Sequence, residues 1–290
     1  MSHTARHFTL AVALVTSLGA GLALPTRARA DAAVTEDGGS PDDWEFAFTP
    51  YLWLPAQSGT IGVGGKEAAV DVSIMDSLDL MGDHLSLIAG FFHFEAKKRR
   101  FFTFLDATLS ALDTDSNVTV ENSTVGGIDL AASFEQNVAI LEFAAGYQVL
   151  ALPLPERTRP FILEAFLGAR YYYFWTQVKV TGSNAQLGSA SRRATGDIDW
   201  VDPMIGGRFA VPILEKLDLQ VRGDIGGFDL GSKLAWSMAA FLRYHFDSRP
   251  LGMRPWFALG YKVLDFDWED GSRSIDLNMT GPAMAIGVTF

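Results

Sequence analysis

Residues 217–226 read LDLQVRGDIG, and apolar side chains alternate in them with polar or charged ones. A period of two is that of a β-strand, because successive side chains of a strand point to opposite faces of the sheet. The segment therefore predicts a strand with one apolar face and one charged face. The two faces are Leu217, Leu219, Val221 and Ile225, and opposite them Asp218, Gln220, Arg222 and Asp224.

The charged face of this strand fixes its orientation if a membrane surrounds it. A charged side chain that faces lipid near the midplane costs about 2 to 4 kcal/mol. Turning Asp218, Arg222 and Asp224 towards lipid would therefore cost roughly 6 to 12 kcal/mol. We expect these three side chains to point into the interior of a barrel, which we call the lumen.

Two other segments repeat the pattern over a greater length. Residues 233–246 (KLAWSMAAFLRYHF) and residues 161–175 each keep large apolar side chains on one face. The aromatic residues of 161–175 gather at one end, as they do in the girdle of a membrane barrel. Strands this long are uncommon in soluble sandwiches. The side chains predicted on their inner faces are Lys233, Ser237, Arg243 and His245, and Glu164, Gly168 and Arg170.

The same alternation along the rest of the chain predicts an all-β protein, a transmembrane antiparallel up-and-down β-barrel of about ten strands. Eight to twelve strands fit the pattern. Residues 56–83, 113–134 and 178–197 are predicted as long outer loops. Residues 69–74 alternate as well and predict an extracellular hairpin or a further strand pair, so twelve strands is the main alternative. The predicted strands are 44–55, 84–96, 101–112, 135–150, 160–177, 198–212, 216–228, 233–246, 255–267 and 279–290.

Composition fits an exported membrane barrel and excludes several other classes. Hydrophobic residues make up 48% of the 290-residue chain, yet after the first 30 residues there is no apolar run of about 18 residues, as a membrane helix needs. The chain has no cysteine, which excludes disulfides and cysteine-ligated metals. The formal net charge of −11 argues against a nucleic-acid partner.

The first 30 residues have the features of a secretory signal peptide. Arg6 precedes an apolar run from Phe8 to Leu24, and Ala28-Arg29-Ala30 follows as a cleavage site. We expect cleavage before Asp31. Residues 31–43 are rich in Asp and Gly without periodicity and predict a disordered periplasmic leader, so that the barrel domain comprises residues 44–290.

Several short stretches resemble a widespread, functionally uncharacterised group of proteobacterial outer-membrane proteins, small barrels of the OmpA-like or porin-like kind. The resemblance covers the whole mature chain. It implies a barrel in the outer membrane, in contact with lipid and lipopolysaccharide, and a terminal aromatic residue, Phe290, recognised by the barrel-assembly machinery. It implies no reaction. The stretches that carry it are Pro50–Trp53, Leu167–Tyr171, Asp199–Pro203, Arg222–Phe228 and Gly287–Phe290.

The predicted lumen carries both signs of charge in nearly equal numbers. In a narrow barrel such charges pair and fill the interior, so we expect a salt-bridged, non-enzymatic structural or surface component with acidic outer loops. The alternative is a narrow channel in which facing acidic and basic rows select small solutes. The predicted network is Glu45, Asp106, Glu142, Glu164, Arg170, Arg208, Asp218, Arg222, Asp224, Arg243 and Lys262.

A hydrolase at the outer rim is the second alternative. His84, beside Asp83, is the one histidine predicted near that rim, whereas His93 and His245 are expected low on inner faces. A catalytic base also needs a partner within hydrogen-bond reach. Sequence alone does not show that any carboxylate lies that close to His84. The candidates at the top of the sixth predicted strand are Asp197, Asp199 and Asp202.

Two acidic stretches approach the spacing of a calcium loop. Val118 and Thr124 stand where such a loop that starts at Asp113 needs Gly and Glu, and the second stretch also lacks the Gly. We therefore expect solvated acidic loops, with weak divalent-ion binding as the alternative, and predict no metal and no cofactor. The stretches are Asp113, Asp115 and Asn117, and Asp265, Asp267 and Glu269.

Overall fold

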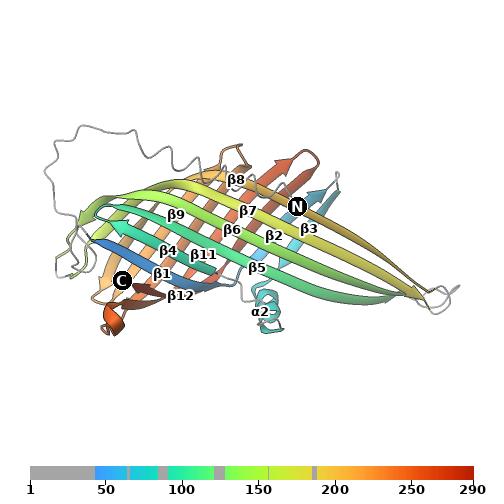
Figure 1. The fold of residues 1–290 in the computed structure, drawn as a ribbon, viewed down its shortest axis with the longest axis horizontal. Helices are drawn as coiled ribbons and strands as arrows, with labels where there is room; N and C mark the ends of the chain where they lie inside the picture. The colour runs from blue at the N-terminus through green and yellow to red at the C-terminus, as the bar shows by residue number, and fades with distance from the viewer. Residues whose placement is uncertain (1–42, 64–65, 84–90, 121–127, 156, 185–187) are drawn as a thin grey trace. The chain divides into compact units, whose positions relative to one another are not determined.

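The structure is a computed structural model, and it describes residues 43–63, 66–83, 91–120, 128–155, 157–184 and 188–290. These residues form one antiparallel sheet of twelve strands (Figure 1). The predicted signal peptide, the leader up to residue 42 and His84 lie outside the described residues. Among the described residues, no helix has the length and apolar character that crossing a membrane would need.

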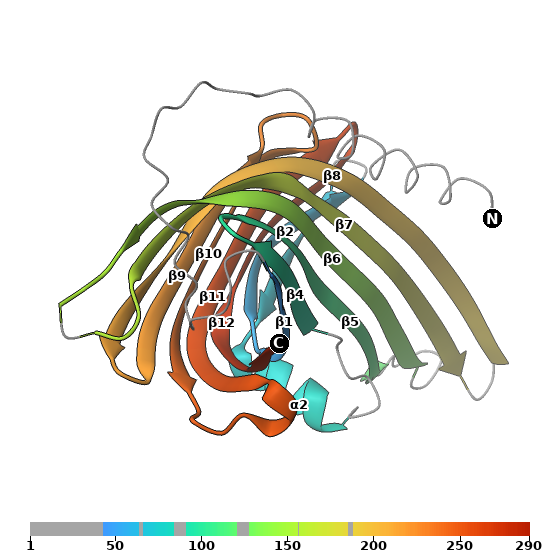
Figure 2. The ribbon, with the colours of Figure 1, turned by 60° about the vertical axis from the view of Figure 1, so that its left-hand side comes forward.

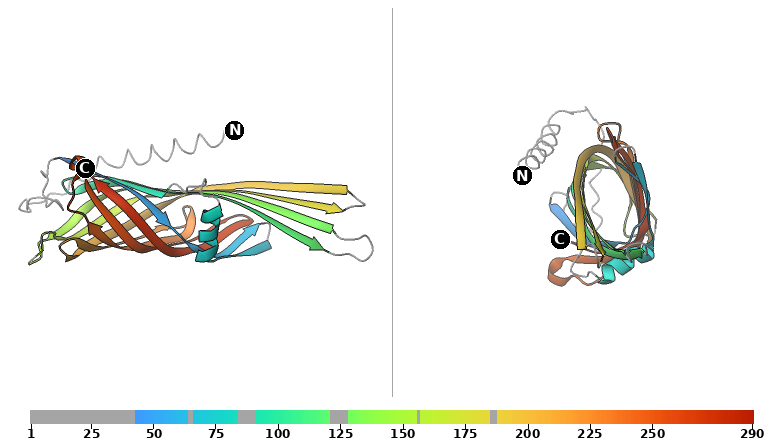
Figure 3. Two further views of the ribbon diagram at one scale, coloured as in Figure 1. Left: turned by 90° about the horizontal axis from the view of Figure 1, so that it is seen from below. Right: turned by 90° about the vertical axis from the view of Figure 1, so that its right-hand side faces the viewer.

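Ten of the strands close into a barrel because the first of them, β1, pairs with the last, β12. The ring follows chain order, with each strand antiparallel to the next, as in an up-and-down barrel. The right-hand view of Figure 3 shows this ring of strands end-on. The strands are β1 Trp44–Trp53, β4 Phe91–Lys98, β5 Phe101–Val120, β6 Ile128–Leu152, β7 Phe161–Asn184, β8 Gly188–Leu214, β9 Leu217–Gly227, β10 Ser232–His245, β11 Arg254–Asp270 and β12 Arg273–Thr289.

The seam between β1 and β12 runs from Ala47 opposite Thr289 to Trp53 opposite Ala283. Beyond it, the backbones of Phe46 and Phe290 exchange two hydrogen bonds of 2.9 Å, and their rings stack at 5.8 Å. The end of β12 thus closes onto the strand that starts at Trp44. We call this end of the barrel the periplasmic end, since an even strand number puts both strand termini there.

The predicted extracellular hairpin within residues 56–83 is present as β2 Ala56–Val63 and β3 Lys66–Val72. β2 continues the path of β1 along β12, from Ala56 opposite Thr280 to Val63 opposite Arg273. A Cβ atom at Gly281 would lie 1.9 Å from the carbonyl oxygen of Leu54, so only glycine admits this close crossing. The hairpin extends the wall without joining the ring, which keeps the barrel at ten strands.

Helix α2, Ile74–Asp83, follows the hairpin and starts with a side-chain cap. The Ser73 hydroxyl and amide donate hydrogen bonds of 2.7 and 2.8 Å to Asp76, and the Asp76 amide donates one of 3.2 Å to the Ser73 hydroxyl. This reciprocal pattern is a capping box. The two hydrogen bonds from Ser73 lower the pKa of the exposed Asp76 carboxyl. The 3-10 turn η2, Pro250–Gly252, lies between β10 and β11 at the periplasmic end.

Strands β5 to β8 are much longer than predicted, with 20, 25, 24 and 27 residues. The predicted loops 113–134 and 178–197 are wrong, because most of their residues continue these strands. The prediction ended each strand where one face stopped being apolar, but a strand beyond the lipid needs no apolar face. Figures 1 and 2 show the four strands running on together past the ends of their neighbours.

The outer surface of the ring is apolar and the inner surface carries the charge. Leu167, Ile205 and Leu259 point outward and are more than half exposed, at 63%, 56% and 52%. On the same strands Arg170, Arg208 and Lys262 point inward. A closed barrel with an apolar exterior and satisfied backbone groups is built to span a membrane. The fold is therefore that of a transmembrane, antiparallel up-and-down β-barrel.

Candidate functional site

The lumen holds every member of the charge network that the sequence predicts. Each of them forms an ion pair or a hydrogen bond with a group of opposite charge. Lys233, which the sequence also places on an inner face, is half exposed and pairs with Glu269, because the register of β10 shifts between Ser232 and Leu234. Even-numbered positions of β5 to β9 face inward up to the register shifts after Gln148 and after Pro212. The structure brings these residues into groups that occupy successive levels of the lumen.

The first group, which we call the central ionic layer, is Glu142, Arg170, Arg222, Asp224 and Ser237. Arg170 is fully buried, and its guanidinium donates to Glu142 at 2.9 Å and to Asp224 at 2.6 Å. Arg222 adds a second cation to the same two carboxylates. The Ser237 hydroxyl donates to Asp224 at 2.6 Å. Two cations therefore balance two carboxylates inside the barrel.

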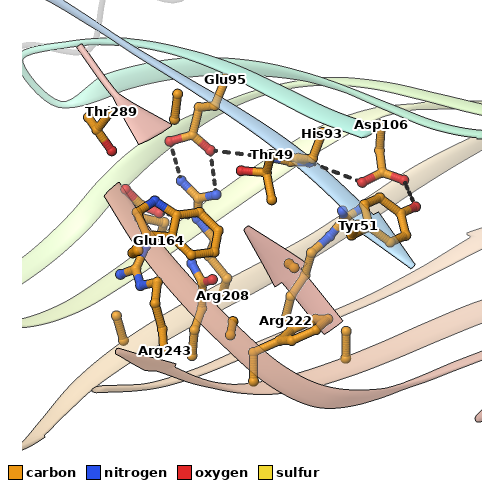
Figure 4. Close-up of a pocket in the computed structure, with 18 of the residues that line it drawn as sticks. Thr49, Tyr51, His93, Glu95, Asp106, Glu164, Arg208, Arg222, Arg243 and Thr289 are labelled. Carbon is orange, nitrogen blue, oxygen red and sulfur yellow. Dashed lines mark hydrogen bonds and ion pairs between the residues drawn. The ribbon is translucent and has the colours of Figure 1, made fainter. Parts of the chain in front are cut away.

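A second group lies beside β4, where Arg208 binds two carboxylates, Glu95 and Glu164 (Figure 4). β8 and β4 lie four strands apart around the ring, so the pair of Arg208 with Glu95 reaches across the lumen. Lys97 donates to Glu164 at 2.9 Å. His93 lies 3.1 Å from Asp106 and 3.7 Å from Glu95, linking the two.

Asp106 also receives groups from two other strands. The hydroxyl of Tyr51 donates to it at 2.8 Å, and Lys262 of β11 approaches within 3.7 Å. β11 and β5 are four strands apart around the ring, so this contact is another one across the lumen. Ion pairs therefore cross the lumen in two directions at this level.

The third group lies at the periplasmic end and centres on Asp218. Its carboxylate accepts from Arg243 at 3.0 Å and from Arg159 at 2.9 Å, and His245 lies 2.6 Å from it. Arg159 comes from the connection between β6 and β7. Near it, Arg254 donates to Glu45 at 2.6 Å.

Sequence reasoning missed several members of these groups. Glu95 and Lys97 share the inward parity of His93, and this signal in the sequence was sufficient to include them. Arg159 and Arg254 lie at or beyond strand ends, where no periodicity indicates direction. Tyr51 was read as part of a family motif, whereas its hydroxyl belongs to the Asp106 group.

The outer half of the lumen is filled by aromatic side chains, which we call the aromatic cluster: Tyr172, Phe174, Trp200, Phe266 and Trp268. All five are at least nine-tenths buried. Tyr172 contacts Phe266 with ring centroids 4.9 Å apart, although β7 and β11 are four strands apart in the ring. Trp200 stacks on Tyr172 at 4.5 Å and on Trp268 at 4.9 Å. This cluster therefore spans the lumen from wall to wall.

The turn between β9 and β10 is hydrogen-bonded to the aromatic cluster. The Trp200 indole donates to the Ser232 hydroxyl at 2.9 Å, and the Ser232 amide donates to Asp202 at 2.6 Å. A Cβ atom at Gly231 would lie 2.4 Å from the Asp202 carboxylate. Asp202 thus holds a turn against β8.

The candidates for a hydrolase do not come together in the described part of the chain. Asp202 faces the lumen, whereas Asp197 and Asp199 lie exposed on the opposite face of β8. His84 lies outside the described residues. Among the described residues, no arrangement therefore joins His84 to a pair of carboxylates.

The two acidic stretches that resemble calcium loops belong to strands. Residues 113–117 pair regularly with residues 131–135 of β6. Asp265 accepts from Asn278 at 2.8 Å, and Lys233 binds Glu269 at 2.5 Å. The prediction of solvated loops there is wrong, because alternation of polar residues also suits a strand outside lipid. Among the described residues no group of three metal-binding side chains is present.

A cavity of about 170 Å³ lies in the periplasmic half of the lumen. It extends from Glu45 and Thr289, near the strand ends, to Asp106 and Arg222 at the level of the ion pairs (Figure 4). At about 30 Å³ for each water of the liquid, it has room for about six waters. The lumen is therefore hollow on the periplasmic side and filled on the outer side.

The solved structures that resemble this chain do so only weakly. No known protein family matches the sequence, and no curated protein matches it. Among solved structures, Ail of Yersinia pestis with a heparin analogue aligns with 10% identity and a TM-score of 0.25, over 86% of this chain and 99% of that chain. A FadL homologue of Pseudomonas aeruginosa aligns with 8% identity and a TM-score of 0.26, over 85% and 90%. The toluene transporter TodX of P. putida aligns with 10% identity and a TM-score of 0.27, over 86% and 90%.

Proposed function

We propose that this protein is a non-enzymatic component of the outer membrane that conducts no solutes and presents the outer ends of β5 to β8 at the cell surface. The observation that carries the proposal is the filled lumen. Ion pairs cross it at the level of Arg208 and Lys262, and the aromatic cluster crosses it further out. A solute on a straight path would have to displace both.

The length of β5 to β8 supports a role at the surface. A tilted strand crosses the hydrocarbon core with about 9 to 11 residues, whereas β8 has 27. In its outer part, residues 188–198 pair with β7 and with no other described strand. Such a projecting sheet with an open edge offers backbone groups to a partner outside the cell.

A narrow channel is the second candidate, because a cavity of about 170 Å³ lies in the periplasmic part of the lumen. Liposome swelling separates the two functions. We expect proteoliposomes to swell in small sugars or amino acids no faster than liposomes that contain the unrelated filled barrel of an OmpA-type protein. Swelling that is faster and falls with solute size would replace the proposed function by the channel.

The proposal includes Phe290 as the residue that the barrel-assembly machinery recognises. Its backbone and ring contacts are with Phe46, so a change of side chain leaves the backbone bonds in place. We expect Phe290→Ser to lower the amount of folded barrel in cells while the purified chain still refolds in detergent. An equal loss of folded barrel in cells and in detergent would mean that Phe290 stabilises the barrel and is not the residue that the assembly machinery recognises.

A further inference from the structure

We propose that the outer surface of the periplasmic rim at β1, β4 and β5 binds the phosphate headgroup of an anionic phospholipid, with Lys98 as the residue that meets the phosphate. Lys98 is the last residue of β4. Lys97 before it points into the lumen and donates to Glu164, so the side chain of Lys98 points outward. The cost of an outward charge falls from the midplane of the membrane to its interface, and the strand end places Lys98 at the interface.

Lys98 lies in a row of exposed aromatic side chains on the outer surface. It is opposite Trp44 of β1 and Phe101 of β5. Phe101 in turn is opposite Tyr147 of β6. The exposed fractions of Trp44, Phe101 and Tyr147 are 55%, 67% and 40%. Aromatic side chains of this kind mark the level at which the hydrocarbon core meets the headgroups, so the row places Lys98 at headgroup level.

The ammonium group of Lys98 has an aromatic ring as its neighbour. Its nitrogen lies 5.4 Å from the ring centroid of Trp44, and among the described residues no carboxylate forms an ion pair with it. Lys216, in the periplasmic turn between β8 and β9, is by contrast paired with Asp247. A lysine at the edge of lipid extends its ammonium towards the headgroups. The phosphate of a lipid is therefore the negative group that Lys98 meets.

The apolar part of the site is preformed. The rings of Phe101 and Tyr147 meet edge to face with centroids 5.0 Å apart. The Gln148 amide donates to the carbonyl oxygen of Arg100 at 2.7 Å, which fixes the turn that joins Lys98 to Phe101. A phospholipid can therefore lay its acyl chains along the two rings while its phosphate meets Lys98.

The same features select the headgroup. Phospholipid forms the leaflet of an outer membrane on the periplasmic side. The headgroup of phosphatidylglycerol carries its phosphate without a cation of its own, whereas in phosphatidylcholine the choline lies beside the phosphate and weakens its attraction to an ammonium. The site should therefore prefer phosphatidylglycerol. The inference rests on the proposed membrane location and not on the closed lumen, so a barrel that conducted solutes would leave it intact.

Native mass spectrometry of the full chain in a non-ionic detergent tests the site, with dioleoyl phosphatidylglycerol and dioleoyl phosphatidylcholine as the probes. The ratio of lipid-bound to lipid-free barrel should be about five-fold higher for phosphatidylglycerol, and Lys98→Gln should remove this difference. Inorganic phosphate should not displace the lipid, because it has no acyl chains to pack on Phe101. Equal binding of the two lipids to the unmodified chain, or displacement by phosphate, overturns the proposal.

Two control variants locate the binding. Lys216→Gln removes one cation from another periplasmic turn and should leave the binding of phosphatidylglycerol unchanged. Lys98→Arg keeps the charge and should keep the preference for phosphatidylglycerol. Heat-modifiable migration in gels checks that each barrel is folded. If Lys98→Gln and Lys216→Gln weaken binding equally, the lipid responds to the total charge of the rim and not to Lys98, and the proposal is wrong.

Discussion

The central ionic layer and the aromatic cluster cross the lumen with opposite kinds of chemistry. In the central ionic layer each charge depends on its partners, so the loss of one cation leaves two buried carboxylates with a single cation. In the aromatic cluster the contacts between rings are many and individually weak, so the loss of one ring leaves a void but no charge. The charged layer is therefore vulnerable at single atoms, whereas the aromatic cluster is vulnerable in proportion to the volume removed.

The largest effect is expected for Arg170→Met. Glu142 and Asp224 would keep only Arg222, and breaking a buried pair of this kind costs about 3 to 5 kcal/mol. Urea unfolding in detergent measures the loss. The control is Arg193→Met on the exposed outer part of β8, which should change the free energy of unfolding by less than about 0.5 kcal/mol. Equal effects of the two variants would contradict the proposed dependence on partners.

Phe266→Ala probes the aromatic cluster. Phe266 is fully buried, and its removal should cost about 3 kcal/mol through lost contacts and a void. Phe143→Ala is the matched control, because Phe143 faces outward and is 41% exposed, so lipid can occupy the vacated space. If both variants unfold at the same urea concentration, the cluster does not behave as a packed core.

Trp200→Phe removes the five-membered ring of the indole and with it the hydrogen bond to Ser232. We expect a loss of about 2 kcal/mol, from the hydrogen bond and from the small void, and faster amide exchange at Ser232, because the turn between β9 and β10 is released. Hydrogen exchange followed by mass spectrometry over residues 228–235 measures it. Trp236→Phe, at an outward position of β10, is the control and should leave the exchange unchanged. If the turn stays protected in Trp200→Phe, the hydrogen bond from Trp200 to Ser232 does not hold the turn in place.

The smallest effect lies outside the barrel wall, at the cap of α2. The folded-state pKa of Asp76 is lowered by Ser73, so the stabilisation is present above the ordinary pKa of aspartate and is lost as pH falls through the lowered value. In a carbon-13 NMR titration the Asp76 midpoint should lie below that of an exposed aspartate. Ser73→Ala should move it back towards the ordinary value; an unchanged midpoint would exclude the cap as its cause.

The sequence predicts the charged layer well and the aromatic cluster only in part, for a physical reason. Asp218 and Arg222 are tolerated on one face only, because lipid excludes them from the other, so their parity reveals their direction. Trp200 and Phe266 are tolerated on both faces, and their inward direction follows only indirectly, from the parity that they share with Arg208 and Lys262. Their contact across the lumen depends on closure and on register with neighbouring strands, which periodicity within one strand does not contain.

Strand number and closure are also readable from the sequence, but strand length is not. The ends of the ten predicted barrel strands are marked by turns at the periplasmic side, where KKRR at residues 97–100 is followed at once by β5. On the outer side, residues 113–120 have no apolar face to mark them. Residues 113–120 form a strand because they pair continuously with β6. Which segments pair is decided by the fold and cannot be seen in the local sequence.

The central claim, that the lumen is closed by its own side chains, is tested most directly by single-channel recording. The purified barrel is inserted in a planar bilayer, with heat-modifiable migration of the same sample as proof of folding. The filled lumen predicts a flat current trace in concentrated potassium chloride at moderate voltage. Steady, reproducible conductance steps from the folded protein would contradict it.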